Sequence, residues 1–68
     1  MIEVKLDKDY YHLQADMERW CIENIGPGMW GDLNRMPDCV WAISSRFWLT
    51  TFYFRENKQA SMFLLRWA

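Results

Sequence analysis

Cysteine is scarce in this 68-residue sequence and neither sign of charge is in clear excess, and each of these two features excludes a class of protein. Two cysteines cannot make the disulfide framework of a small secreted domain, so we expect a reduced, cytoplasmic protein. The formal net charge of -1 provides no overall field that would attract nucleic acid or an anionic membrane. No stretch approaches the ~18 apolar residues of a membrane span, and the N-terminal segment lacks the apolar region of a signal peptide. We therefore expect no membrane partner.

Aromatic side chains are what the sequence has in quantity: five Trp, three Tyr and four Phe. A chain of this size buries only about 60% of the surface that its unfolded form exposes, so its core must be dense. Each aromatic side chain can bury roughly 150–250 Å², which supplies that density. The composition predicts one folded domain over residues 1–68 and excludes a disordered tail.

In the first 25 residues, the apolar side chains recur at two different spacings, one after the other. Residues 2–6 alternate apolar and charged side chains, as a strand does. Residues 7–25 change to spacings of three and four, which predicts one amphipathic helix capped by Asp7 or Asp9 and ended by Gly26. Its expected buried stripe consists of Tyr10, Leu13, Met17, Trp20, Cys21, Asn24 and Ile25.

Residues 40–54 are rich in β-branched and aromatic side chains, which predicts two strands joined by a tight turn at residues 44–46. Successive side chains of a strand point to opposite faces, so one face is expected under the helices and the other open. The buried face is expected to carry Trp41, Ile43, Phe52 and Phe54. The open face is expected to carry Glu3, Lys5, Ala42, Ser44, Leu49, Thr51 and Tyr53.

The C-terminal segment returns to helical spacing, with Asn57 as the expected cap. A rival interpretation ends this helix near Phe63 and lets residues 64–68 pair as an edge strand. The element order is thus β-α-β-β-α, with or without a short final strand. It predicts an α+β protein, a small ferredoxin-like sandwich whose antiparallel sheet carries both helices on one face.

Residues 26–31, GPGMWG, match the dinucleotide-binding pattern G-x-G-x-x-G letter for letter. In that motif the glycines follow a strand and begin a helix, whose backbone N–H groups then face the pyrophosphate. Here they follow a predicted helix, so the nearest helix end is the C-terminal one, whose partial negative charge repels phosphate. Pro27 also has no N–H to donate. We interpret these glycines as a helix cap and a turn, and expect no cofactor.

Residues 26–39 hold all three glycines and both prolines, which predicts one long connection. Its apolar side chains allow two interpretations. In one, Trp30 and Leu33 fold back as a lid over one end of the core. In the other, Met29, Trp30 and Met36 are partly exposed and form a recognition surface, since methionine adapts its shape and tryptophan is common at binding hot spots.

No set of side chains has the spacing of a catalytic or metal site. The only histidine, His12, is poorly placed for Cys21 on the same predicted helix, which leaves only a pairing with Cys39 open. These three soft ligands show no C-x-x-C spacing, so a zinc site is not predicted. We expect a non-enzymatic protein that binds no metal.

The C-terminal half, FWLTTFYFRENKQASMFLLRWA, combines an aromatic strand, a polar turn and an A-x-x-F-x-L-R-W ending. In these features it resembles the C-terminal ends of small uncharacterised proteins of tailed bacteriophages. The matching positions are Phe52, Phe54, Ala60, Phe63, Leu65, Arg66 and Trp67. The resemblance covers a third of the chain and brings no activity, cofactor or catalytic residue. It implies a protein that works in the cytoplasm of a host bacterium by binding a host or virion protein.

The sequence therefore predicts a protein-interaction module, which binds another protein or associates with itself as a homo-oligomer. Met29, Trp30 and Met36 are the expected anchors for a partner. Leu49 and Tyr53, on the open sheet face, are expected to form a second, self-associating surface.

The alternative function is single-stranded nucleic-acid binding through the open sheet face, because small sheets of this kind can stack bases on exposed aromatic side chains. Tyr53, Lys5 and Arg46 would make that contact. The aromatic motif of RNA-binding sheets is absent from the sequence, which makes protein contact the preferred prediction.

Overall fold

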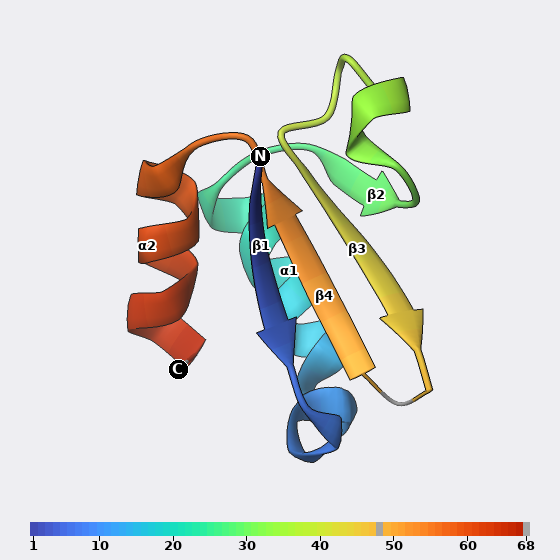
Figure 1. Ribbon diagram of the computed structural model, residues 1–68. Coiled ribbons are helices and arrows are strands. Elements are labelled where there is room, and N and C mark those ends of the chain that lie inside the picture. Colours follow the sequence, from blue (N-terminus) through green and yellow to red (C-terminus); the bar gives the residue numbers. More distant parts are fainter. Residues whose placement is uncertain (48, 68) are drawn as a thin grey trace.

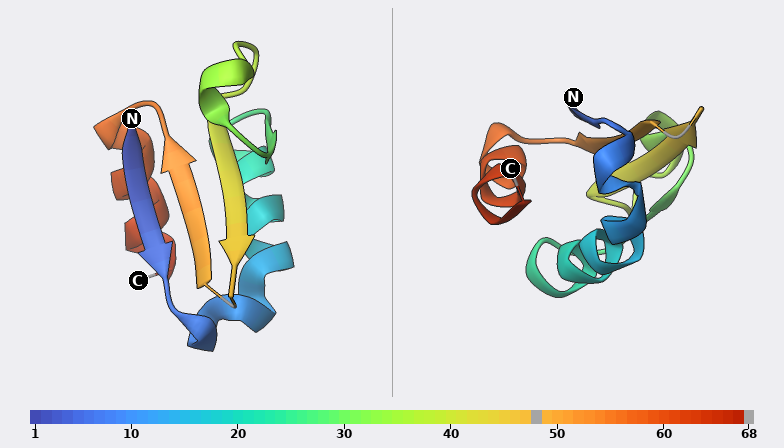
Figure 2. Two further views of the ribbon diagram at one scale, coloured as in Figure 1. Left: turned by 45° about the vertical axis from the view of Figure 1, so that its right-hand side comes forward. Right: turned by 90° about the horizontal axis from the view of Figure 1, so that it is seen from below.

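The computed structural model describes residues 1–47 and 49–67, which form a four-stranded sheet with two α-helices on one face (Figures 1 and 2). In chain order the elements are β1 (Ile2–Leu6), the 3-10 helix η1 (Lys8–Leu13), α1 (Gln14–Asn24), β2 (Gly28–Trp30), the 3-10 helix η2 (Leu33–Arg35), β3 (Trp41–Arg46), β4 (Leu49–Phe54) and α2 (Asn57–Trp67). The strand order is β1-β4-β3-β2. The α+β class and the placement of both helices on one face are confirmed.

The sheet is mixed, so the expectation that it is antiparallel throughout is wrong, and a ferredoxin-like strand order is not confirmed. β1 and β3 run antiparallel to β4, with Val4 and Ile43 on either side of Phe52. β2 runs parallel to β3, with Met29 beside Ala42. The extra strand lies inside residues 26–39, where glycine and proline predicted a connection. After β2 the chain returns through η2, and this return makes the parallel pairing possible.

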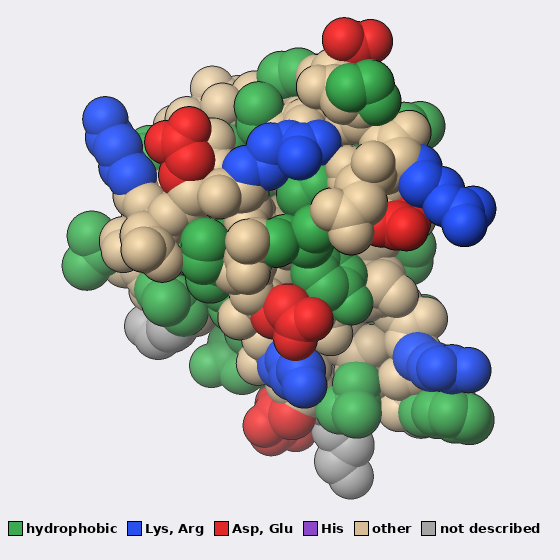
Figure 3. Space-filling model, turned by 45° about the horizontal axis from the view of Figure 1, so that its top comes forward, with side chains coloured by type: hydrophobic (Ala, Val, Ile, Leu, Met, Phe, Trp, Pro, Cys, Tyr) green, Lys and Arg blue, Asp and Glu red, His purple; other side chains and the backbone are tan. Residues whose placement is uncertain are grey.

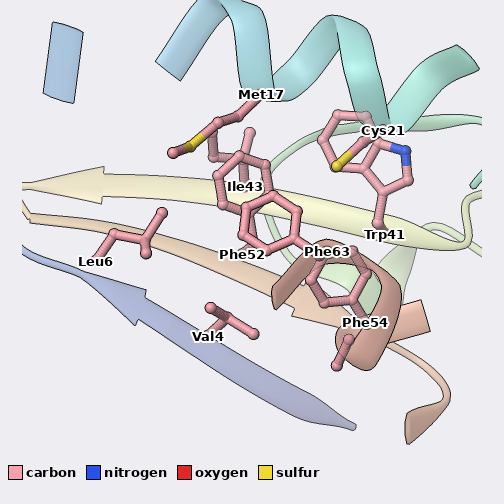
Figure 4. Packing of buried hydrophobic residues seen from close by; sticks show 10 residues of the cluster. Val4, Leu6, Met17, Cys21, Trp41, Ile43, Phe52, Phe54 and Phe63 are labelled. Carbon is pink, nitrogen blue, oxygen red and sulfur yellow. The ribbon is translucent and has the colours of Figure 1, made fainter. Parts of the chain in front are cut away.

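The core lies between the sheet and the helices, where the rings of Trp41, Phe52, Phe54 and Phe63 meet (Figure 4). The Phe63 ring centroid lies 4.6 Å from that of Phe52 and 5.3 Å from that of Phe54. Trp20 of α1 meets Phe63 edge-on at 6.1 Å, so this ring joins both helices to the sheet. The strand side chains expected on the buried face are all fully buried: Trp41, Ile43, Phe52 and Phe54.

Residues 7–25 form two helices, whereas the sequence predicted one. Asp7 is the N-terminal cap, as expected, and its Oδ1 accepts a hydrogen bond from the Asp9 N–H at 3.0 Å. The turn that follows is the 3-10 helix η1, in which residues three apart lie on one side. Tyr10 and Leu13 both pack against the core in this way, before α1 begins at Gln14.

Two of the glycines of GPGMWG, Gly26 and Gly28, are required for different structural reasons. Gly26 has a φ of +143° and follows the end of α1, where its N–H donates to the Cys21 carbonyl oxygen at 3.0 Å. Gly28 faces the Trp41 indole, which fills the space that a Cβ would need. The Trp41 Nε1–H donates to the Gly26 carbonyl oxygen at 2.7 Å and fixes the ring there. The glycines of this pattern therefore end α1 and leave space for the Trp41 indole.

The β3–β4 turn is displaced from its expected position. Residues 44–46 belong to β3, and Arg46 pairs with Leu49, so the connection follows residue 46. Serine is common in turns, which is why the sequence pattern favoured the earlier position. In the sheet, Ser44 and Ser45 instead face threonines of β4.

α2 continues through Trp67, so the rival edge strand is wrong for residues 64–67, while residue 68 lies outside the described chain. Its start also differs from the expectation, because Asn57 is the first residue of the helix. The Gln59 side chain accepts a hydrogen bond from the Glu56 N–H at 3.2 Å, which is half of a capping box. No helix in the described residues has the length and apolar character needed to cross a bilayer.

Candidate interaction surface

The two cysteines and the histidine lie on different segments of the described structure. His12 is exposed on η1, Cys21 is fully buried on α1 and Cys39 is half-buried before β3. Among residues 1–47 and 49–67, no group of three His, Cys, Asp or Glu could hold a metal ion. Burial, with a smaller effect of the nearby Glu18 carboxylate, raises the pKa of the Cys21 thiol to about 12.

The raised pKa of Cys21 predicts a loss of stability in alkali. The folded protein keeps the Cys21 proton up to about pH 12, whereas the unfolded chain releases it above the ordinary value of 9.0. The stabilisation is thus complete below pH 9 and falls as the pH rises from there toward 12, by at most about 1.4 kcal/mol per pH unit. Chemical denaturation across this range is expected to show a steeper decline for the native protein than for Cys21→Ala. If the stability of both proteins fell equally with pH, the raised pKa of Cys21 would be contradicted.

The long segment between α1 and β3 is divided between the core and the surface. Leu33 is fully buried, Met36 is half-buried, and Met29 and Trp30 are half-exposed on β2. The parallel register sets Met29 beside Ala42, on the open face, and sets Trp30 beside Ile43, on the helix face. The structure therefore does not bring Met29, Trp30 and Met36 together on one face.

Arg55, a residue to which sequence reasoning gave no role, binds this segment to the end of β4. Its Nε–H donates to the Cys39 carbonyl oxygen at 2.8 Å, and its Nη2 donates to those of Leu33 at 2.9 Å and Met36 at 3.0 Å. Three carbonyl oxygens thus converge on one guanidinium group, whose fixed donor fork suits such a site. Arg55 is the attachment point of the segment from η2 to β3.

The open face of the sheet carries the remaining candidate residues. Tyr53 of β4 lies near its centre, between Glu3 of β1 and Ala42 of β3. Leu49 lies at the hairpin end of the same strand and is 53% exposed. The sequence predicted which residues lie on this face, because they alternate along the strands with the apolar residues of the buried face. Acidic and basic side chains lie interspersed among hydrophobic ones on the side of the molecule seen in Figure 3.

Two hollows flank Tyr53 on this face. The first, of about 390 Å³, lies between the sheet and η2 and is lined by Met1, Glu3, Gly31, Asp32, Leu33, Asn34, Ser44 and Tyr53. The second, of about 480 Å³, opens toward the β3–β4 turn and is lined by Lys5, Leu6, Asp7, Ser44, Arg46, Phe47, Leu49, Thr51 and Tyr53. Leu49 and Tyr53 thus line one shared hollow, which we call the turn hollow.

Phe47, at the rim of the turn hollow, was not among the predicted site residues. It is 84% exposed, and its φ of +52° is the left-handed conformation, which costs a non-glycine residue about 1–2 kcal/mol. The Arg46 guanidinium carbon lies 5.9 Å from its ring centroid. A two-residue hairpin connection commonly needs this conformation and favours Asn, Asp or Gly. An exposed aromatic ring at such a position is unfavourable for the fold.

No protein-family model, no curated protein and no solved structure matches this chain. The function is therefore inferred from the geometry of the described residues. The turn hollow combines a half-exposed leucine, a tyrosine and an exposed phenylalanine with two cationic side chains and one carboxylate, Lys5, Arg46 and Asp7.

Proposed function

We propose that this protein is a non-enzymatic protein-interaction module, which binds a protein partner through the turn hollow and the Phe47 ring at its rim. The observation that carries the proposal is the strained, 84% exposed Phe47 beside Leu49 and Tyr53. Backbone strain of this kind is often retained where it serves a contact. Large, rigid aromatic side chains are also the commonest anchors of protein interfaces.

Met29, Trp30 and Met36 were the expected anchors for a partner, and we now assign the main contact to the turn hollow. The reason is that Met29 and Trp30 lie on opposite faces of the sheet. The resemblance to small phage proteins supports a host or virion protein as the partner, within the cytoplasm of a host bacterium.

Phe47→Asn is expected to stabilise the fold while weakening partner binding. Asparagine adopts the left-handed conformation more readily, so we expect a gain of about 1 kcal/mol, which raises Tm by roughly 4–8 °C in a domain of this size. Loss of the exposed ring should weaken binding, so that the partner is no longer captured. Thermal denaturation, together with affinity capture from a nuclease-treated bacterial lysate, measures both effects.

Trp30→Ala is the matched control for this experiment, because it also removes a half-exposed aromatic ring but lies on β2. The proposal predicts that Trp30→Ala retains the partner that Phe47→Asn loses. If Phe47→Asn retains the partner and only the stability changes, Phe47 is a turn residue without a role in binding.

Single-stranded nucleic-acid binding is the second candidate, because Lys5, Arg46 and Tyr53 line the same hollow. Two cations beside one tyrosine could hold a phosphate and stack a base. Such binding weakens steeply as salt is added, whereas apolar protein contact responds little. A labelled single-stranded oligonucleotide titrated at low and high salt tests this candidate. Binding that decreases steeply with salt and is weakened by Arg46→Ala would favour it over a protein partner.

A further inference from the structure

β1 is an edge strand whose outer side has no neighbour among the described residues. Such edges expose unpaired N–H and C=O groups, and proteins commonly protect them with charged side chains, proline, a bulge or an inward-pointing charge. β1 has no proline, bulge or inward-pointing charge: its register with β4 is continuous from Ile2 to Leu6, and its two charges, Glu3 and Lys5, point to the open face and are of opposite sign. The opposite edge, β2, has only three residues. β1 is therefore the edge more suited to pairing.

The charges of β1 are self-complementary. In an antiparallel pair of two β1 strands centred on Val4, Glu3 of each strand lies opposite Lys5 of the other, and Ile2 lies opposite Leu6. Opposite charges directly across two strands stabilise the pair, while like charges destabilise it. Within one chain, Lys5 Nζ and Glu3 Oε2 are 3.8 Å apart, and both side chains are largely exposed and free to reach a second strand.

The helix behind β1 provides a second contact layer. α2 lies behind β1 (Figure 2), and Phe63 contacts Trp20 of α1. The 100° step per residue sets Met62 and Leu64 on opposite flanks of Phe63. Met62 is half-buried, whereas Leu64 is 42% exposed. The exposed flank of α2, which carries Leu64, therefore faces away from α1 and toward the outer edge of β1.

We propose that a second copy of this chain pairs with β1 in antiparallel register centred on Val4, which joins two sheets into one of eight strands. Two Glu3–Lys5 pairs form on the open face, and Leu64 of each α2 approaches that of the other copy on the helix face. This interface goes beyond the partner contact proposed above. It leaves Phe47 and Leu49 free, so that the dimer presents two turn hollows.

Charge reversal tests both the interface and its register. Analytical ultracentrifugation is expected to show a dimer for the native protein. Glu3→Lys alone and Lys5→Glu alone each place like charges opposite one another twice, so each is expected to weaken dimerisation by ~10-fold or more. The double variant, Glu3→Lys with Lys5→Glu, restores both pairs and should recover the native affinity.

A mixture of the two single variants gives the sharpest result, because each variant carries the charges that the other lacks. The mixture should form a heterodimer under conditions where neither variant dimerises alone. Both positions are exposed, and an unchanged circular dichroism spectrum controls for folding. A monomeric native protein at every concentration would overturn the proposal. So would a dimer that both charge reversals leave intact and that Leu49→Glu dissociates, because its interface would be the open face.

Discussion

Gly28→Ala is expected to destabilise the protein by about 3 kcal/mol, a large part of the roughly 3–10 kcal/mol available to a domain of this size. A Cβ at this position would overlap the Trp41 indole and lie 2.6 Å from its Nε1. The ring is fully buried and bound to the Gly26 carbonyl oxygen, so it cannot move aside without losing that hydrogen bond. Urea denaturation followed by circular dichroism measures the loss.

A second substitution separates this collision from a general effect of alanine on the backbone. Trp41→Leu removes the indole, so adding Gly28→Ala to a Trp41→Leu protein should cost much less than it does in the native protein. If the two substitutions add independently, the assumed contact between Gly28 and the ring is wrong.

Arg55→Ala is expected to cost about 2 kcal/mol, because three carbonyl oxygens lose a charged donor. The loss should be concentrated between η2 and β3. Hydrogen exchange by mass spectrometry is therefore expected to show faster exchange of backbone amides in residues 31–40, with little change in α1.

Arg35→Ala is the matched control, since it removes an arginine from the same segment. The Arg35 side chain forms a surface ion pair with Asp32, at 3.7 Å, and such pairs contribute at most about 1 kcal/mol. Arg55→Lys should behave nearly like Arg55→Ala, because a single ammonium cannot reproduce the guanidinium fork. Equal effects of Arg35→Ala and Arg55→Ala would show that Arg55 has no special role.

The strands and helices that bury one face were predictable, because a buried face leaves a period in the sequence. Val4 and Leu6 alternate with charges, and Phe52 and Phe54 alternate with polar or half-exposed residues. β2 left no such period, since it has three residues and one is glycine. The pairing of β2 with β3 requires a glycine at position 28, because the Trp41 ring fills the space beside it. Trp41 lies thirteen positions later, and a local sequence pattern does not reveal such a long-range contact.

The candidate surface was predictable to a similar degree. Leu49 and Tyr53 followed from strand parity once the buried face was assigned. Phe47 could not be predicted in this way. Aromatic residues favour strands, so the sequence gives no indication of the left-handed backbone conformation that Phe47 adopts. A signal was nonetheless available: extending the strands to equal length places the turn after residue 46. Arg55 had no signal, since its three partners are backbone carbonyl oxygens.

The central claim is that the turn hollow binds a protein, and affinity capture with a single-residue control tests it most directly. Native protein and Leu49→Glu, which introduces a charge at a 53% exposed position, are presented to a nuclease-treated bacterial lysate at low and high salt. We expect one protein to be retained in stoichiometric amount by the native chain at both salt concentrations and lost from Leu49→Glu. Equal retention by the two chains, or retention by the native chain that high salt abolishes, would contradict the claim.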